Sequence, residues 1–361
     1  MSDFLTLKVE IIKNFGTPCA VVDLNVLEKN ISRVQKICDN AGLSNRPHIK
    51  THKSGEVARM QIDAGASGVT CQKLGEAEVM AAAGITDILI ATNLLGAAAS
   101  GALSALQSRI SLKVCADNTY SISAYAEAAR DAGRILDVLV ECDTGQKRAG
   151  VETPEEAFNL AQLIDNDSHL NFKGLLYYPT KNNWKKTELF NAKLVELLSS
   201  KNLIPDIVST GGTPNLQNLG TLSGSTEHRA GTCVFNDLMM VKDGFATMDE
   251  CALRVYTSVV SRAGKDRGIL DAGSKALTSD QGGLNGFGFI QEYSDASIHK
   301  LAEEHGFLNL VNCAVKPSVG EIVRVIPNHV CVVVNMLREL VLVRDTKILD
   351  VMTVEARGML G

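Results

Sequence analysis

The stretch Arg46-Pro47-His48-Ile49-Lys50-Thr51-His52-Lys53 gathers two lysines, two histidines and an arginine around one proline. A short apolar run precedes it and a helical pattern follows it. Taken alone, it allows three interpretations. It is a solvated basic loop, a patch for phosphate or nucleic acid, or the end of a strand that presents a lysine amine to a carbonyl group. The rest of the chain favours the third.

The composition excludes several classes of protein. The chain has 361 residues, which is enough for two domains. Its net charge of −5 argues against general binding to nucleic acid or to an anionic membrane. Apolar stretches such as residues 87–99 are interrupted by polar residues and are too short to span a bilayer. No basic segment followed by an apolar one opens the chain, so no secretory signal is expected.

The nine cysteines are scattered, without any Cys-x-x-Cys spacing. Several lie inside apolar runs, as Cys19, Cys115 and Cys313 do. This usage is typical of reduced core thiols in a cytoplasmic protein.

Short apolar runs alternate with helical patterns through the first two thirds of the chain. The expected strands are residues 19–23, 46–50, 68–71, 87–92, 111–117, 137–143, 172–178, 206–210 and 227–231. Strands that alternate with helices predict a parallel sheet covered by helices. About eight such units favour a closed (β/α)8 barrel. An open doubly wound sheet is the alternative, but no Gly-x-Gly-x-x-Gly follows the first run.

The pattern changes near residue 248. Short β-branched runs separated by turn residues follow, at 253–260, 268–271, 321–326, 330–334, 339–343 and 347–354. They predict an antiparallel β domain. The expected fold is therefore α/β, with a (β/α)8 barrel over residues 17–248 and a β domain over residues 249–361. Residues 1–16 can join either domain.

The ends of the expected barrel strands carry residues suited to an anionic cofactor. Active sites of parallel barrels form at the carboxyl ends of the strands, where Lys50 and the segment 209–213 both lie. Hydroxyls and glycines before a helix allow backbone N–H groups to approach a phosphate. One such loop can be an ordinary turn, but Gly231-Thr232 repeats the pattern one strand later. A lysine together with a phosphate cup indicates pyridoxal 5′-phosphate.

With these motifs taken together, the sequence resembles the fold-type III pyridoxal-phosphate enzymes, specifically the D-serine dehydratase and D-threonine aldolase family. The fold of this family is similar to that of alanine racemase. The resemblance covers nearly the whole chain and rests on Thr17-Pro18, residues 46–53, 71–78 and 209–214, Asp143-x-Gly-x-x-Arg148-x-Gly150, Phe235-Asn-Asp237, Asp271-Ala-Gly-Ser-Lys275 and Pro327-Asn-His329-Val-Cys331.

The resemblance implies a role for each of the matching residues. Lys50 would bind the cofactor covalently, and Arg148 would face its pyridine nitrogen. An arginine does not deprotonate, so it donates a hydrogen bond there without readily protonating the ring. The alternative for Arg148 is an ion pair with Asp143. The remaining residues expected around the cofactor are Gln72, Tyr178, Thr210, Gly211, Gly212, Thr213, Gly231, Thr232 and Cys233.

His329 and Cys331 are expected on one face of a strand, because they are two residues apart. Imidazole and thiolate are both good zinc ligands. By itself such a pair is more often a buried histidine beside a core cysteine, but the resemblance implies a divalent metal site. Zn²⁺ is expected before Mn²⁺ or Mg²⁺. Two protein ligands leave positions open for water and substrate, as a catalytic metal requires.

These features predict a metal-assisted lyase that acts on a D-3-hydroxy amino acid. A dehydratase, which releases a 2-oxo acid and ammonia, is favoured by Cys331. The resemblance implies an aspartate at that position in the aldolases, which suits a harder ion. The aldolase alternative gives glycine and an aldehyde.

Two further alternatives remain from the sequence. A racemase would need a second acid or base, for which Tyr256 is the candidate. A non-catalytic cofactor-binding barrel would have no use for the β domain. The expected partners are a small D-amino acid and a second copy of the chain, in a homodimer, with neither nucleic acid nor membrane.

Overall fold

The computed structural model describes residues 2–181 and 183–361. The chain divides into two compact units. The first contains the residues up to Ile31, Thr51–Ser54 and Thr232–Gly358, and the second contains Ser32–Lys50, Gly55–Gly231 and Met359–Gly361. The boundary expected after residue 248 lies inside the first unit.

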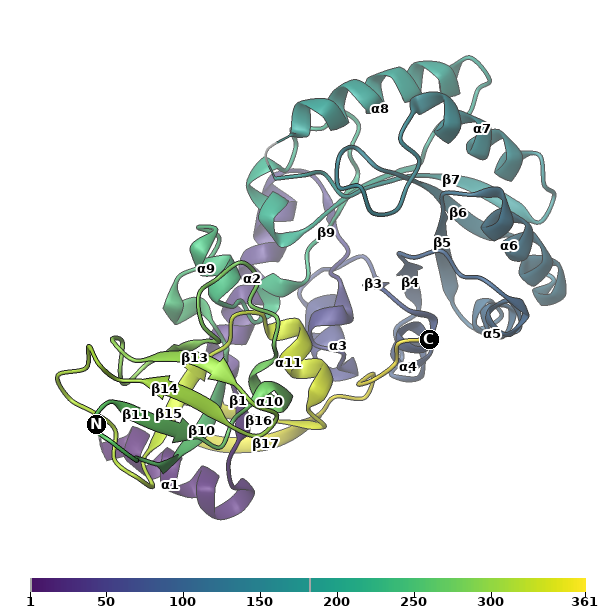
Figure 1. The fold of residues 1–361 in the computed structure, drawn as a ribbon. Coiled ribbons are helices and arrows are strands. Elements are labelled where there is room, and N and C mark those ends of the chain that lie inside the picture. The colour runs from purple at the N-terminus through teal and green to yellow at the C-terminus, as the bar shows by residue number, and fades with distance from the viewer. Residues whose placement is uncertain (1, 182) are drawn as a thin grey trace. The chain divides into compact units, whose positions relative to one another are not determined.

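The second unit is built on an eight-stranded parallel sheet (Figure 1). Its strand order is β2-β9-β8-β7-β6-β5-β4-β3, and a parallel bridge between His48 and Thr70 joins its two edges. The strands are β2 (Ser44–Asn45), β3 (Val69–Cys71), β4 (Asp87–Ile90), β5 (Ser111–Ala116), β6 (Leu136–Cys142), β7 (Leu170–Tyr177), β8 (Ile207–Gly211) and β9 (Glu227–Arg229). The expected barrel fold is confirmed.

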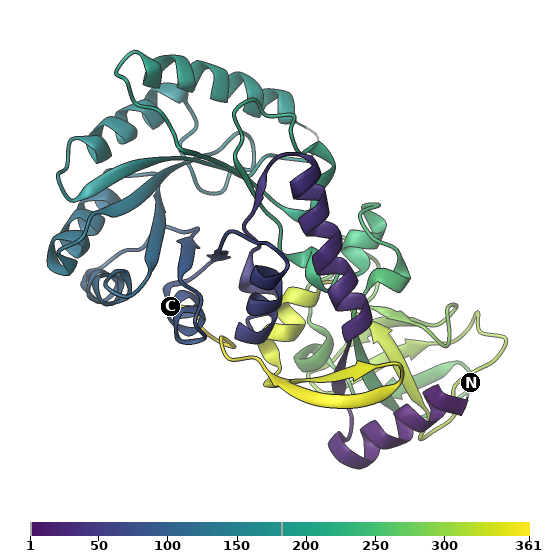
Figure 2. The same cartoon turned by 180° about the vertical axis from the view of Figure 1, so that it is seen from behind.

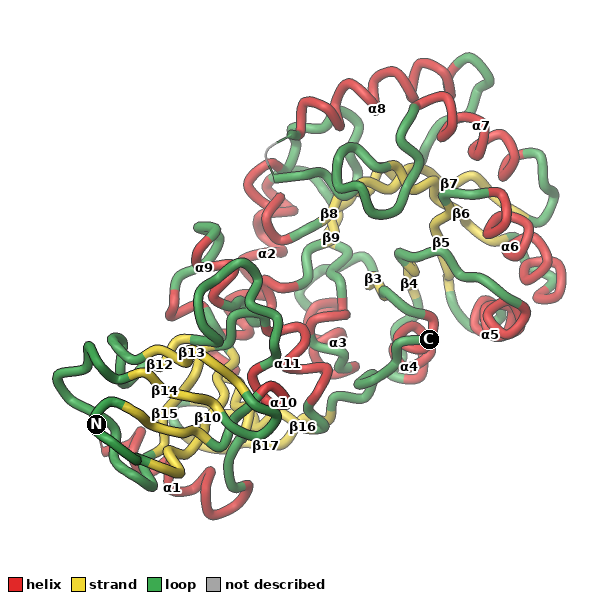
Figure 3. Tube along the Cα trace, in the orientation of Figure 1, coloured by secondary structure: helices red, strands yellow, loops and turns green. Residues whose placement is uncertain are grey.

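Helices connect these strands and cover the outer face of the curved sheet, as Figure 3 shows in red against yellow. Local sequence sets their ends. The α7 helix begins at a Thr153 cap, followed by Pro154 and a reciprocal bond with Glu156, and α6 ends at Gly133 with φ of 64°. The helices are α3 (Gly55–Asp63), α4 (Leu74–Ala82), α5 (Ala97–Gln107), α6 (Thr119–Ala132), α7 (Pro154–Asp165) and α8 (Trp184–Ser199). The helix α2 (Leu24–Asn40) precedes β2 and has residues in both units.

The first expected barrel strand was assigned to the wrong sheet. Residues 19–23 form β1 (Cys19–Asp23), which pairs with β10 (Leu253–Ser261) and β16 (Glu339–Arg344) in the first unit. An apolar run indicates a buried strand, but its partners come from distant sequence and leave no local signal. The expected strand at residues 46–50 was also wrong, because β2 ends at Asn45 and a 3-10 turn, η1, covers Ile49–Thr51.

The sheet of the first unit has the order β13-β14-β11-β10-β1-β16-β17, and β15 pairs with β10 and β12. It is mainly antiparallel, but β1 and β16 run parallel. Its other strands are β11 (Arg267–Leu270), β12 (Phe289–Ile290), β13 (Ser297–Leu301), β14 (Gly306–Asn309), β15 (Ile322–Ile326) and β17 (Lys347–Thr353). The strands β13 and β14 were not predicted from the sequence.

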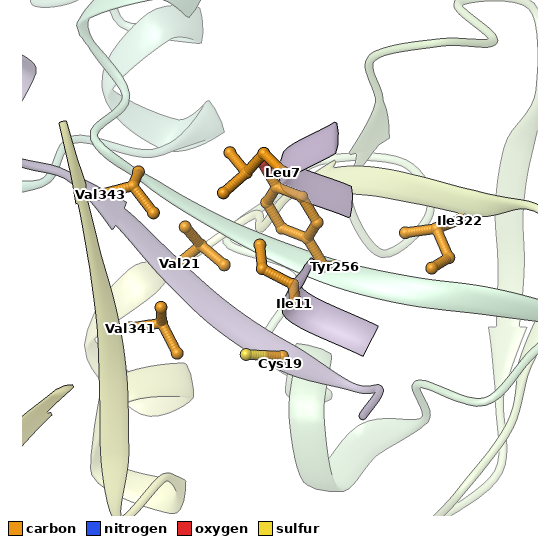
Figure 4. Close-up of a cluster of buried hydrophobic side chains, with 8 residues drawn as sticks. All are labelled: Leu7, Ile11, Cys19, Val21, Tyr256, Ile322, Val341 and Val343. Carbon is orange, nitrogen blue, oxygen red and sulfur yellow. The ribbon is translucent and has the colours of Figure 1, made fainter. Parts of the chain in front are cut away.

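One face of this sheet is covered by α1 (Ser2–Phe15), as Figure 2 shows. Leu7 and Ile11 of this helix are buried against Cys19, Val21 and Tyr256. Figure 4 shows the cluster, in which the Tyr256 ring lies among aliphatic side chains. The same unit holds the short helices α9 (Leu238–Lys242), α10 (Ser274–Leu277) and α11 (Val330–Met336).

The strand expected at residues 330–334 is wrong, because this segment is the helix α11. Val330, Val333 and Val334 are its buried residues. Their spacing of three and four is helical, although the run of valines favours a strand by propensity. Tertiary packing therefore overrides local preference here.

Across the described residues, the structure has no helix long and apolar enough to cross a membrane.

Candidate active site

Lys50 lies in the short turn η1, which begins at Ile49, after the barrel strand β2 has ended at Asn45. Its side chain is exposed, whereas the preceding Ile49 is fully buried and anchors the turn. Nearby, His48 Nε2 lies 3.3 Å from Gln72 Oε1, and Gln72 donates a hydrogen bond of 3.0 Å to the carbonyl of Ala91. Lys50 is thus an exposed lysine in a turn whose neighbour Ile49 is buried.

The glycine pair at the end of β8 forms a tight cradle under Tyr178. A Cβ on Gly212 would lie 3.0 Å from both Cζ and Oη of that ring, and Gly212 has φ of 99°. A Cβ on Gly211 would lie 2.9 Å from Nη2 of Arg229. Only glycine fits these two positions without displacing a neighbour. A 3-10 turn, η2 (Thr213–Asn218), follows, and the backbone N–H of Asn215 donates to the carbonyl of Gly212 at 2.9 Å.

His228, the middle residue of β9, supports this loop. Its Nε2 donates to the carbonyl of Gly212 at 3.1 Å, so its Nδ1 accepts from the hydroxyl of Thr210 at 2.8 Å. Burial lowers the pKa of His228 to about 3, although the bond to Gly212 opposes the shift. The imidazole is therefore neutral at physiological pH and holds both ends of the glycine loop.

Arg229 is a second buried residue behind the loop. Its guanidinium donates to the carbonyl of Tyr177 at 3.0 Å and to the hydroxyl of Ser209. Sequence reasoning missed both His228 and Arg229. They were seen only as part of a strand that leads to Gly231, and nothing local marks their side chains as supports for another strand.

Arg148 lies in the loop after β6, with its guanidinium carbon 5.1 Å from the centroid of the Tyr178 ring. The Asp143 carboxylate accepts backbone hydrogen bonds, in contrast to the ion pair with Arg148 considered above. It accepts backbone N–H bonds from Gly145 and Gln146, both at 2.7 Å, and from Arg148 at 3.1 Å. Burial raises the pKa of Asp143, but these bonds outweigh burial and lower it. Asp143 therefore stabilises the loop through its backbone, and the Arg148 side chain packs against the Tyr178 ring.

His329 and Cys331 meet at the start of α11 in the first unit. His329 is the N-cap residue, and its side chain hydrogen-bonds that of Cys331. The Cys331 sulfur also lies 3.1 Å from the hydroxyl of Thr51 and 3.9 Å from that of Thr232. His329 Nδ1 donates to Asp237 Oδ2 at 3.0 Å. Burial lowers the pKa of His329, but the bonds with Asp237 and Cys331 outweigh burial and raise it to about 10.

The residues expected around the cofactor and the metal are distributed over the two units. The second unit contains Lys50, Gln72, Arg148, Tyr178, Thr210, Gly211, Gly212, Thr213 and Gly231. The first contains Thr232, Cys233, His329 and Cys331. The chain passes from one set to the other directly, at Lys50-Thr51 and again at Gly231-Thr232. Thr51 and Asp237 were both in quoted motifs, but their contacts with the histidine and cysteine were not anticipated.

The glycine loop with Lys50 suits the cofactor that the sequence implied, and the His329–Cys331 pair suits the metal. The glycine cradle admits close approach of a phosphate, and Lys50 supplies an exposed amine. His329 and Cys331 offer one nitrogen and one sulfur donor, and the described residues contain no cluster of three or more histidines, cysteines or carboxylates able to hold a metal. Tyr256 is only 3% exposed and packs in the cluster of Figure 4, which is the position of a core residue.

Comparison with known proteins gives the class of each part of the chain. Residues 22–238 match the family described as alanine racemase, N-terminal domain. Residues 252–343 match the family described as putative serine dehydratase domain. Together these matches define a pyridoxal-phosphate barrel joined to a dehydratase-type β domain.

Individual relatives cover almost the whole chain. D-threonine aldolase from Arthrobacter sp. is 32% identical, over 95% of this chain and 93% of its own length. D-threo-3-hydroxyaspartate dehydratase from Delftia sp. is also 32% identical, over 87% of this chain and 90% of its own. The chain belongs to the fold-type III pyridoxal-phosphate enzymes, in the family of D-serine dehydratase and D-threonine aldolase.

Solved structures agree with this placement. The crystal structure of D-threonine aldolase from Filomicrobium marinum has a TM-score of 0.88 at 28% identity, over 96% of both chains. D-threo-3-hydroxyaspartate dehydratase has been solved with a histidine replaced by alanine, and with a cysteine two positions further on replaced by alanine. The cysteine variant is in the metal-free form. It has a TM-score of 0.85 at 28% identity and covers 94% of this chain and 98% of its own.

Proposed function

We propose that this protein is a metal-assisted pyridoxal-phosphate lyase that acts on D-3-hydroxy amino acids, with dehydration as its main reaction. The observation that carries the proposal is the meeting of His329 and Cys331 at the start of α11. A histidine and a cysteine at the same spacing were replaced in solved structures of D-threo-3-hydroxyaspartate dehydratase, and the cysteine variant was solved in a metal-free form.

Lys50 would hold the cofactor covalently, and Gly211, Gly212 and Thr213 would hold its phosphate. Arg148, placed by Tyr178, would donate a hydrogen bond to the pyridine nitrogen. When bound, the cofactor supplies an electron sink for negative charge that develops at the substrate Cα. Gln72, Thr210, Gly231, Thr232 and Cys233 complete the proposed set.

His329 and Cys331 would hold the metal ion. A bound divalent ion with two protein ligands supplies a Lewis acid for the substrate hydroxyl. The soft thiolate of Cys331 favours Zn²⁺ over Mn²⁺ or Mg²⁺. Cys331 is half-buried rather than buried, unlike the eight other cysteines, which suits a residue that binds a ligand.

Lys50 would also perform the proton transfer. Its Nζ would accept the proton from Cα of the substrate. The hydroxide departs from Cβ, and water then releases ammonia to leave a 2-oxo acid. The buried neighbour Ile49 anchors the turn that carries Lys50 and so limits where that amine can reach.

Aldol cleavage is the second candidate. It is favoured by the D-threonine aldolase relative, which is as similar to this chain as the dehydratase is. In this reaction a base removes the proton of the substrate hydroxyl, and the bond between Cα and Cβ breaks to give glycine and an aldehyde. A racemase has less support, because Tyr256 is packed in the core.

We further propose a cytoplasmic homodimer. All nine cysteines are free thiols, as expected in a reducing compartment. A second subunit would shield the reacting groups from water, which protects reactive intermediates from hydrolysis and misprotonation. Light scattering at assay concentration tests this, and a fully active monomer would contradict it.

Product analysis tests the reaction itself. D-Serine, D-threonine and D-3-hydroxyaspartate are each incubated with Zn²⁺ and with Mn²⁺. A 2-oxo acid and ammonia identify the dehydratase. Glycine with an aldehyde would identify the aldolase instead, and the opposite enantiomer alone would identify a racemase.

A further inference from the structure

Asp237 is the one fully buried carboxylate that contacts the His329–Cys331 pair among the contacts the structure describes. It follows Phe235 and Asn236, and its exposed fraction is 0%. A carboxylate buried to this extent is costly unless donors surround it. Its partners therefore indicate what it does.

Three N–H groups bond to Asp237. Oδ1 accepts from the backbone of Met240 at 3.0 Å, which caps α9. Oδ2 accepts from the backbone of Val330 and from Nδ1 of His329, both at 3.0 Å. One oxygen is thus used for an ordinary helix cap, and the other is shared between the first residue of α11 and the imidazole.

The shared oxygen fixes which nitrogen of His329 can bind a metal. A carboxylate accepts hydrogen bonds and does not donate them, so Nδ1 must carry the hydrogen. Nε2 is then the nitrogen that can lose its proton and bind a metal ion with its electron pair. The bond to Val330 also fixes the first turn of α11, in which Cys331 is the second residue.

We propose that Asp237 is a positioning residue for the metal site. It holds His329 in the tautomer whose Nε2 can bind a metal ion, and it fixes the turn that carries Cys331. This inference rests on the proposed function, because it takes the pair to be the metal-binding residues.

Two substitutions separate this role from helix capping. Asp237→Asn keeps the size of the side chain, but it replaces one acceptor oxygen with an amide donor. Asp237→Ser keeps a good N-cap for α9 and is too short to serve His329 as well. Thr153→Ala is the matched control, because it removes the cap of α7 in the second unit and leaves the pair untouched.

The measurement is zinc affinity of the pyridoxal-loaded protein, by competition with a chromophoric chelator. Loss of a partner that orients a metal-binding histidine weakens metal affinity by about 10- to 100-fold. We expect that loss in both Asp237 variants and none in Thr153→Ala. In zinc-loaded wild type, ¹⁵N NMR of the histidine rings should show His329 protonated at Nδ1 only, with the signal assigned by its absence in His329→Gln.

The outcomes test the role of Asp237 separately from the proposed metal site at His329 and Cys331. Wild-type zinc affinity in both Asp237 variants, with loss in His329→Gln, overturns the role of Asp237 and leaves the metal site standing. Equal zinc affinity in wild type and His329→Gln overturns the metal site, and the role of Asp237 with it. Protonation of His329 at Nε2 in the zinc-loaded protein also overturns the inference.

Discussion

Replacing Gly212 with alanine tests whether the glycine cradle is the phosphate site. The new Cβ would lie 3.0 Å from Cζ and Oη of Tyr178, which is closer than ordinary contact. Either the ring or the loop must move by several tenths of an ångström. Gly220 is a matched control, because it also has a positive φ, 82°, but a Cβ there would meet nothing within 4 Å.

The two glycine variants should lose similar free energy of unfolding but differ in their affinity for the cofactor. An L-residue at such a φ costs about 1–2 kcal/mol, so both variants should lose about that much free energy of unfolding. Only Gly212→Ala should displace the Tyr178 ring or the loop that would hold the phosphate. A hydrogen bond to a charged group contributes about 1.5–3 kcal/mol, so losing one weakens cofactor affinity by about 10- to 100-fold.

The assay titrates each apoprotein with pyridoxal phosphate and follows the absorbance of the bound cofactor, with urea denaturation in parallel. Gly220→Ala should bind the cofactor as tightly as wild type while showing the loss of stability. Equal cofactor affinity in all three proteins would refute the assignment of the phosphate site to this loop.

Three other substitutions test separate parts of the account. Borohydride reduction followed by peptide mass spectrometry should place the cofactor on Lys50, and Lys50→Ala should abolish the label. A label on Lys53 would contradict the assignment. His228 stays neutral in the fold because its pKa is lowered to about 3, whereas the unfolded chain takes up a proton below the ordinary value of 6.5. His228 should therefore have no effect on the pH dependence of stability above pH 6.5, and below it stability should fall by up to about 1.4 kcal/mol per pH unit. Urea denaturation at pH 7.5 and 5.5 should show a smaller fall in His228→Gln, and equal falls would remove His228 as the cause. Thr51→Val keeps the shape of the side chain but removes the hydroxyl 3.1 Å from the Cys331 sulfur. Zinc affinity should drop by about tenfold, and unchanged affinity in the chelator competition would make that contact incidental.

The alternating pattern predicted the barrel because each parallel strand is an apolar run with a helix behind it, a signal that is local in sequence. The placement of residues 19–23 could not be predicted in the same way. Their pairing with β10 and β16 joins segments more than 200 residues apart, and the run itself is equally apolar in either sheet.

In the candidate site, too, local sequence signals predicted some residues, whereas tertiary contacts were not predicted. Lys50, Arg148, Gly212 and His329 were predicted because they lie in motifs or at strand ends. The partners that support them were not, because the link from His228 to the glycine loop, or from Asp237 to His329, depends on tertiary contact. The helix at α11 also replaced the expected strand, yet its first turn brings His329 and Cys331 together.

We propose that Lys50 binds the cofactor and that the His329–Cys331 pair independently binds a metal needed in the reaction. Dialysis against a strong chelator, followed by assay with D-3-hydroxyaspartate and by borohydride reduction, tests it directly. We predict that lyase activity disappears and returns with Zn²⁺, while the cofactor stays on Lys50 throughout. Full activity after chelation, with zinc absent by elemental analysis, would contradict the account.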